Sequence, residues 1–267
     1  MVTVTEPIAG DPLLKVSDVT LRFGGLSVLD AVSFTVRESE VLALIGPNGA
    51  GKTSLFNVLT RAYQPQSGSI VLHTVDGTID VLRTPAHRLV EHGVARTFQN
   101  LQLTAELTVL ENVLVGRHHL MRSGTLTNLL WLGRASREQR AHAEIARDTL
   151  EFLGLGDVAD FRVDTLPYGV RKSVELARAL ATRPKLLLLD EPAAGLNDDE
   201  TDQMAALLRM LRASGTCTPV LIEHDVRMVM ETADRIVALD FGKVLSEGTA
   251  AEVAAHPEVL AAYLGAE

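Results

Sequence analysis

Four short stretches of the chain are apolar with almost no alternation, a pattern typical of strands that are buried on both faces of a sheet. They are Val41–Ile45, Leu186–Leu189, Pro219–Ile222 and Arg235–Leu239. Stretches with helical periodicity separate them. Because strands that alternate with helices at short spacing form parallel sheets, the sequence predicts an α/β fold with a mostly parallel sheet.

The N-terminal part of the chain alternates between apolar and polar residues, which predicts antiparallel strands. Leu13–Arg22 and Val32–Val36 follow this pattern. Ser69–Leu72 and Thr78–Leu82 flank Asp76-Gly77, a dipeptide suited to a tight hairpin turn. We therefore expect an N-terminal antiparallel β subdomain beside the parallel sheet.

The middle of the chain has the pattern of helices. Thr108 and Glu111 have the spacing of a capping box ahead of apolar residues at helical intervals, and a later helix is expected to stop at Gly154. The segment 122–134 contains two glycines and the only tryptophan, and its structure is the least predictable. We expect a single domain over residues 1–267 with an inserted α-helical subdomain at about 100–165.

Composition narrows the class of protein. The chain has 267 residues, 46% of them hydrophobic and 22% charged, which is typical of a globular protein. A net charge of −9 without a basic block argues against nucleic-acid binding. We see no secretory signal and no apolar run of the ~20 residues that span a bilayer. A single cysteine, Cys217, excludes an intrachain disulfide and suits a reducing cytoplasm.

The first apolar strand runs into a glycine-rich loop with the pattern G-x-x-x-x-G-K-T and then into a helix. This order is that of a phosphate-binding loop, whose backbone N–H groups and helix dipole face an anion. We expect the Lys52 amine to reach the β- and γ-phosphates and the Thr53 hydroxyl to ligate Mg²⁺. The alternative is a glycine-rich turn without a ligand. The candidate nucleotide-binding residues are Gly46, Pro47, Asn48, Gly49, Ala50, Gly51, Lys52, Thr53 and Ser54.

Two carboxylates follow the second buried strand. Asp190 and Glu191 come directly after four leucines, at the edge where parallel sheets place their ligands. We expect Asp190 to hold Mg²⁺, directly or through water, together with Thr53. Glu191 is expected to orient or deprotonate the attacking water. An acidic pair after a strand alone could equally serve helix capping and solubility.

Three further side chains are candidates for the same site. Gln99, at the end of a short strand, could ligate Mg²⁺ or the attacking water, although a surface amide is the simpler interpretation. His224 ends a parallel strand and could donate a hydrogen bond to a γ-phosphate. Phe23 could stack on an adenine or could simply lie at the rim of the core.

In order and spacing, these motifs resemble the nucleotide-binding subunits of ATP-binding cassette (ABC) transporters. The matching segments are Gly46–Thr53, Gln99, Leu166–Val170, Leu186–Glu191, Ala194–Asn197 and His224. The resemblance covers nearly the whole chain. It is closest to the ATPase subunit of branched-chain amino acid importers at Ala95–Asn100, Thr108–Gly116, Glu191–Asn197 and Ala262–Gly265.

The resemblance implies a P-loop NTPase with a RecA-like core that hydrolyses ATP with Mg²⁺. It also implies that two ATPase subunits face head to tail, each ATP lying between one phosphate loop and the other subunit's signature loop. Here that loop contains Pro167, Tyr168 and Gly169 instead of the family's usual Ser-Gly-Gly. The lost hydrogen bond from the serine is worth about 1.5–3 kcal/mol unless it is replaced. Two alternatives follow: the subunit belongs to a heterodimer with a better-endowed partner, or its subfamily tolerates Pro and Tyr at these positions.

The resemblance further implies transmembrane permease subunits that contact Gln99 and the helical insertion, and indirectly a substrate-binding protein. The expected location is the cytoplasmic face of the inner membrane, with a chain that is soluble when expressed alone. Urea, for an importer, and lipopolysaccharide, for an exporter, are the alternative cargoes to branched-chain amino acids. A soluble P-loop ATPase that is not coupled to transport is the alternative class.

Overall fold

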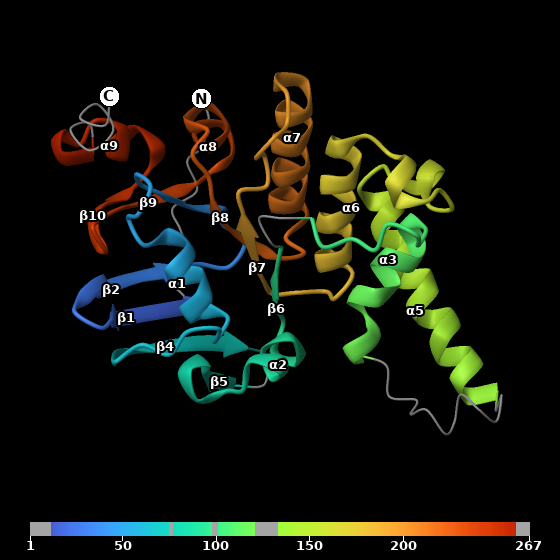
Figure 1. Cartoon of the computed structure of the whole chain (residues 1–267), viewed down its shortest axis with the longest axis horizontal. Coiled ribbons are helices and arrows are strands. Elements are labelled where there is room, and N and C mark those ends of the chain that lie inside the picture. Colours follow the sequence, from blue (N-terminus) through green and yellow to red (C-terminus); the bar gives the residue numbers. More distant parts are fainter. Residues whose placement is uncertain (1–11, 75–76, 98–100, 121–132, 260–267) are drawn as a thin grey trace, which may run out of the picture.

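The computed structural model describes residues 12–74, 77–97, 101–120 and 133–259, with a central sheet at its core (Figure 1). The sheet has the strand order β10-β9-β3-β8-β7-β6, and all neighbours are parallel except β10, which is antiparallel to β9. The prediction of a mostly parallel sheet is confirmed. Its strands are β3 (Leu42–Ile45), β6 (Val94–Arg96), β7 (Leu186–Asp190), β8 (Thr218–Ile222), β9 (Arg235–Asp240) and β10 (Lys243–Gly248).

The N-terminal part forms a second, antiparallel sheet with the order β2-β1-β4-β5, as the alternating pattern predicts. Its strands are β1 (Leu14–Phe23), β2 (Leu26–Val36), β4 (Ser67–Thr74) and β5 (Gly77–Asp80). The last strand ends two residues earlier than predicted. The Asp80 carboxylate accepts a hydrogen bond from the Leu82 amide at 2.9 Å and so caps a 3₁₀ helix instead of continuing the strand.

One hydrophobic core fills the space between the two sheets. It contains apolar side chains of α1 (Lys52–Leu59), among them the fully buried Leu55 and Phe56, together with residues from strands of both sheets. Burial of this face holds the start of α1 against the carboxyl end of β3. The phosphate loop is therefore fixed at both of its ends.

Helices cover the other face of the central sheet and form a group at one side of the molecule, where α3, α5 and α6 pack on one another (Figure 1). The predicted Thr108–Glu111 capping box is present at the start of α3. Within the described ranges, every helix is too short or too polar to cross a bilayer. Besides α1, the α-helices in the described ranges are α2 (Ala86–Leu89), α3 (Val109–Gly116), α5 (Gly133–Phe152), α6 (Tyr168–Leu180), α7 (Asp198–Ser214), α8 (Val226–Thr232) and α9 (Ala250–Ala254), and the 3₁₀ helices are Val81–Arg83, Val90–His92, His118–Leu120, Gly156–Val158 and Val163–Thr165.

A buried arginine joins the three helices of this group. Arg117, directly after α3, donates from Nε to His142 Nδ1 of α5 at 2.9 Å and from Nη1 to the Ala181 carbonyl at the end of α6. His142 must be neutral at Nδ1 to accept this bond. Its pKa is lowered by burial and, secondarily, by the Arg117 charge, while Glu138 opposes the shift.

We expect the stability of this helical group to fall in mild acid. Because the folded-state pKa of His142 lies below the ordinary value of 6.5, the unfolded chain takes up the proton first as the pH falls. The contribution of neutral His142 to the free energy of unfolding is fully present above the unfolded-state pKa and is lost as the pH falls through the folded-state pKa. His142→Asn, whose carbonyl oxygen can still accept from Arg117, should lower the dependence of Tm on pH between about pH 7.5 and pH 5.5. An unchanged dependence in the variant would contradict this.

Candidate nucleotide-binding site

The loop between β3 and α1 has backbone conformations that require glycine at two positions. Gly46 has φ 149° and Gly51 has φ 101°. A Cβ on Gly46 would lie 2.1 Å from the Leu239 carbonyl oxygen, and one on Gly51 would lie 2.8 Å from the Val28 carbonyl oxygen. The loop is also held by a hydrogen bond from the Gly242 amide to the Ala50 carbonyl at 3.1 Å. Its curvature is therefore fixed by its neighbours.

The exposed part of the loop carries groups suited to a phosphate. Asn48, Gly49 and Thr53 are exposed, whereas Ala50 and Lys52 are buried. The first amides of α1 cannot be paired within the helix and lie at the positive end of its dipole. This arrangement is that of an anion-binding helix N-terminus.

The Lys52 side chain folds back along the loop. Its Nζ donates to the carbonyl oxygens of Gly46 at 2.6 Å and Pro47 at 3.0 Å. Burial lowers the pKa of Lys52, and the negative charges of Glu191 and Asp190 oppose this shift. The carboxyl ends of the parallel strands β3 and β7 lie at the same edge of the sheet, on either side of β8, which brings the loop and the acidic pair to one site.

Asp190 is the last residue of β7 and is only 3% exposed. Its Oδ2 pairs with Arg96 at 2.7 Å, while Oδ1 is buried and has no hydrogen-bond partner within the described ranges. A buried carboxylate oxygen without a donor is stabilised by a hard cation or its water ligands. Asp190 therefore fits Mg²⁺. Among the described residues, no group of three or more acidic, histidine or cysteine side chains could hold a metal alone, so phosphate and hydroxyl oxygens have to complete the coordination.

Glu191 follows in a left-handed conformation with φ 49°, which is uncommon for a residue with a Cβ. Its amide donates to the Ile222 carbonyl at 3.0 Å, and its carbonyl accepts from the Ala194 amide at 3.1 Å. These two hydrogen bonds fix the backbone on both sides of Glu191. A strained residue of this kind is held in place only by its surroundings.

Arg96 is a site residue that sequence reasoning did not identify. Its guanidinium pairs with Asp190, donates to Asn57 Oδ1 at 2.7 Å and lies 5.5 Å from the ring centroid of Phe56. It thus ties β6, three residues before Gln99, to both α1 and β7. An arginine inside a short apolar strand is the signal that could have revealed it, because a buried cation requires a partner.

Removing this cation should be strongly destabilising. Arg96→Met leaves the buried Asp190 charge without its partner, and breaking one side of a buried pair costs about 3–5 kcal/mol. Urea unfolding measures this loss in the free energy of unfolding. The double variant Arg96→Met/Asp190→Asn removes both charges and should recover a large part of it. Equal stability of the single and double variants would rule out the pairing as the cause.

The remaining predicted residues lie at different places. His224, two residues after the end of β8, has a side chain that is 67% exposed. Phe23 is 49% exposed and packs edge-on against Tyr63, with ring centroids 5.2 Å apart. Ser54 is half-buried in the first turn of α1. Gln99 lies outside the described residues.

The signature loop contacts the segment after Glu191 within the same chain. Pro167 is the N-cap of α6, and the Tyr168 hydroxyl donates to the Ala194 carbonyl at 3.4 Å. A Cβ on Gly169 would lie 2.5 Å from Glu200, so only glycine fits there without movement. The sequence analysis assigned Tyr168 to the signature loop that faces the nucleotide of the other subunit and noted it as a departure from the family pattern. The structure shows that it packs against the turn that follows the acidic pair.

Comparisons with known proteins agree with this geometry. Residues 29–194 match the family described as ABC transporter, and residues 243–267 match the family described as branched-chain amino acid ATP-binding cassette transporter. The chain is 43% identical over 254 residues to the high-affinity branched-chain amino acid transport ATP-binding protein BraF of Pseudomonas aeruginosa, covering 95% of this chain and 98% of that protein.

Solved structures give the same result. The ADP conformation of an ATP-binding cassette of an ABC transporter superposes with a TM-score of 0.82 at 30% identity, covering 96% of this chain and 100% of that one. A dimeric ATP-binding cassette in a post-hydrolysis state, bound to ADP and phosphate, superposes with a TM-score of 0.70 at 25% identity, covering 89% and 98%. The fold, the phosphate loop and the relatives coincide: the chain belongs to the ABC transporter family, as one of its ATP-hydrolysing subunits.

Proposed function

We propose that this subunit binds Mg-ATP between the loop Gly46–Ser54 and Asp190 and that ATP hydrolysis there powers import of branched-chain amino acids. One observation carries the site: the loop of Lys52 follows β3 and the acidic pair follows β7, and these strands are both parallel to β8, so segments far apart in sequence meet at the same end of the central sheet. Mg²⁺, when bound by Thr53 and Asp190, neutralises charge on the phosphate oxygens. Gln99 would complete this coordination.

The chain's own residues supply the remaining chemistry. The Lys52 amine exchanges the Gly46 and Pro47 carbonyls for phosphate oxygens, which are stronger acceptors because they are charged. Glu191, held in a fixed turn directly after Asp190, orients the attacking water and takes its proton. The exposed imidazole of His224 can donate a hydrogen bond to the γ-phosphate. Phe23, also exposed, offers a face to the adenine.

A second ATPase subunit completes each site in this proposal. Pro167, Tyr168 and Gly169 of one subunit face the nucleotide of the other. The dimeric relative bound to ADP and phosphate supports such a pair. Tyr168 contacts the segment after Glu191 in its own chain and so links the signature loop of each subunit to its own hydrolytic turn. The dimer is either a homodimer or a heterodimer with a second cassette.

The cargo follows from the relatives, not from the site. The name of the Pseudomonas protein and the C-terminal family match both support branched-chain amino acids. We propose that the subunit docks on transmembrane permeases at the cytoplasmic face of the inner membrane through Gln99 and the helical insertion at about 100–165, with a substrate-binding protein delivering the amino acid.

Co-expression with transmembrane permease subunits of a branched-chain amino acid importer tests this function. We expect the subunit to co-purify with them and to support ATP-dependent uptake of radiolabelled leucine into proteoliposomes, with urea as the competing cargo. Saturable uptake of urea, with no uptake of leucine, would show that urea and not a branched-chain amino acid is the cargo. Full ATPase activity from a subunit that never co-purifies with a membrane protein would favour a soluble ATPase.

A further inference from the structure

Glu223 is a buried carboxylate to which sequence reasoning gave no role. It follows β8, and its side chain is 0% exposed. Its Oε1 accepts a hydrogen bond from the Ala193 amide at 2.7 Å. Its Oε2 accepts from the amides of His224 at 3.1 Å and Asp225 at 3.5 Å. One side chain therefore satisfies backbone donors in two separate loops.

Each of these loops carries a residue of the proposed hydrolytic machinery. Ala193 is two residues after Glu191, whose left-handed backbone needs support from outside the turn. The other loop carries His224, and its ring Nδ1 lies 3.9 Å from Glu223 Oε2. The carboxylate is thus the shared attachment point of the proposed base and the proposed γ-phosphate donor.

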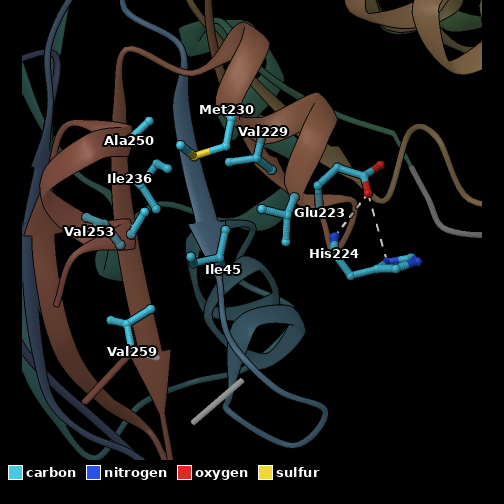
Figure 2. Close-up of a pocket in the computed structure, with 11 residues that line it drawn as sticks. Ile45, Glu223, His224, Val229, Met230, Ile236, Ala250, Val253 and Val259 are labelled. Carbon is cyan, nitrogen blue, oxygen red and sulfur yellow. Dashed lines mark hydrogen bonds and ion pairs between the residues drawn. The ribbon is translucent and has the colours of Figure 1, made fainter. Parts of the chain in front are cut away.

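The surroundings of Glu223 offer few alternative partners. It borders an apolar cavity whose lining includes Ile45, Val229, Met230 and Ile236, and Figure 2 shows Glu223 and His224 at its edge. Burial raises the pKa of Glu223, whereas the hydrogen bonds from the Ala193, His224 and Asp225 amides lower it. A backbone amide released from the carboxylate here would lose its partner in a weakly polar environment, where an unmade hydrogen bond is costly.

We infer that Glu223 is a positioning residue that holds the turn after Glu191 and the loop of His224 at a fixed separation. The inference rests on the proposed function for the roles of Glu191 and His224. The attachment of both loops to Glu223, which we call the clamp, does not depend on those roles. Without it, both loops can shift relative to the phosphate loop. A misplacement of about 1 Å in a catalytic geometry can reduce the rate by about 10²-fold.

Glu223→Gln tests the clamp in the full chain. The amide has one acceptor oxygen, so its NH₂ group must face a backbone N–H of one loop, and one of the two attachments is lost. We expect kcat to fall by about 10²-fold with KM for ATP within about twofold of the unchanged protein, because the phosphate loop is untouched. Hydrogen exchange should rise in both 190–197 and 222–228, because the loop that keeps its bond to residue 223 is no longer held against the other loop. Glu223→Asp keeps the charge but is one methylene shorter, so it cannot reach both loops and should show the same changes. It serves as the test variant if Glu223→Gln does not fold.

Glu40→Gln is the matched control. Glu40 is also a buried carboxylate that accepts from a backbone amide, that of Arg37 at 2.7 Å, and it pairs with Arg235 at 3.2 Å. Because it lies near the amino ends of β3 and β9, its substitution should leave kcat unchanged. An unchanged kcat in Glu223→Gln, an equal loss in Glu40→Gln, or exchange that rises in neither or only one of the two loops would overturn the inference.

Glu191→Gln, measured in the same assay, separates this inference from the proposed function. If Glu191→Gln retains full turnover, the assignment of the base fails. Hydrogen exchange in 190–197 and 222–228 then tests the clamp without reference to catalysis. A rise in both segments of Glu223→Gln supports the clamp, and any other result rejects it.

Discussion

Lys52→Ala is expected to remove nearly all nucleotide binding and ATP turnover. The substitution deletes the charge that the site directs at the β- and γ-phosphates. One charge-assisted hydrogen bond is worth about 1.5–3 kcal/mol, so affinity for Mg-ATP should fall by about 10- to 100-fold. Loss of the same group at the transition state should lower kcat by a further factor of about 10² or more. Fluorescent-nucleotide titration and phosphate release measure the two effects.

Lys243→Ala is the control for this experiment. Its side chain is 65% exposed and pairs with Asp30, whereas the Lys52 amine donates to loop carbonyl oxygens. It should bind and hydrolyse ATP as the unchanged protein does. Because Lys52→Ala also leaves the Gly46 and Pro47 carbonyls without a donor, circular dichroism should confirm that it folds. A folded Lys52→Ala protein with unchanged affinity and turnover would show that the loop does not bind phosphate.

Glu191→Gln is expected to separate binding from hydrolysis. The amide keeps the shape of the side chain but cannot take a proton from water, so turnover should fall by at least about 10²-fold. Affinity for Mg-ATP should remain, because Lys52 and Asp190 are unchanged. Since ATP then persists between the subunits, size-exclusion chromatography with Mg-ATP should show a stable dimer. The dimer should disappear when ADP replaces ATP.

Glu231→Gln provides the comparison. Glu231 has a half-exposed side chain that pairs with Arg209 on the surface, so neutralising it should change neither turnover nor association. Full ATPase activity in Glu191→Gln would remove Glu191 from the role of base. A dimer that forms equally well without nucleotide would separate dimerisation from ATP.

The sequence was sufficient for the fold and the phosphate loop because local patterns determine both. Gly46 and Gly51 have to be glycine for reasons of backbone conformation and close approach, and the motif records this directly. The buried strand before Asp190 is an uninterrupted apolar run, which places the carboxylate at the sheet edge in any parallel arrangement. The end of β5 was predicted less accurately, because the pattern at Asp80 fits either a residue that continues the strand or the N-cap of the following 3₁₀ helix.

Residues that connect separate elements could not be found in this way. Arg96 reaches Asp190 only because β6 lies beside β7, and Glu223 reaches Ala193 only because β8 lies on the other side of β7. Strand order is a property of the whole fold. Tyr168 is similar: its departure from the family pattern is visible in sequence, but its contact with Ala194 depends on how α6 packs.

Calorimetric titration of Mg-ATP into the full chain tests the central claim most directly, namely that the phosphate loop and the carboxylates after β7 form one nucleotide site. We predict saturable heat with about one ATP per chain and a marked loss of affinity when Asp190→Asn is titrated or Mg²⁺ is chelated. The absence of heat with the folded protein, or binding that ignores both Asp190 and Mg²⁺, would contradict it.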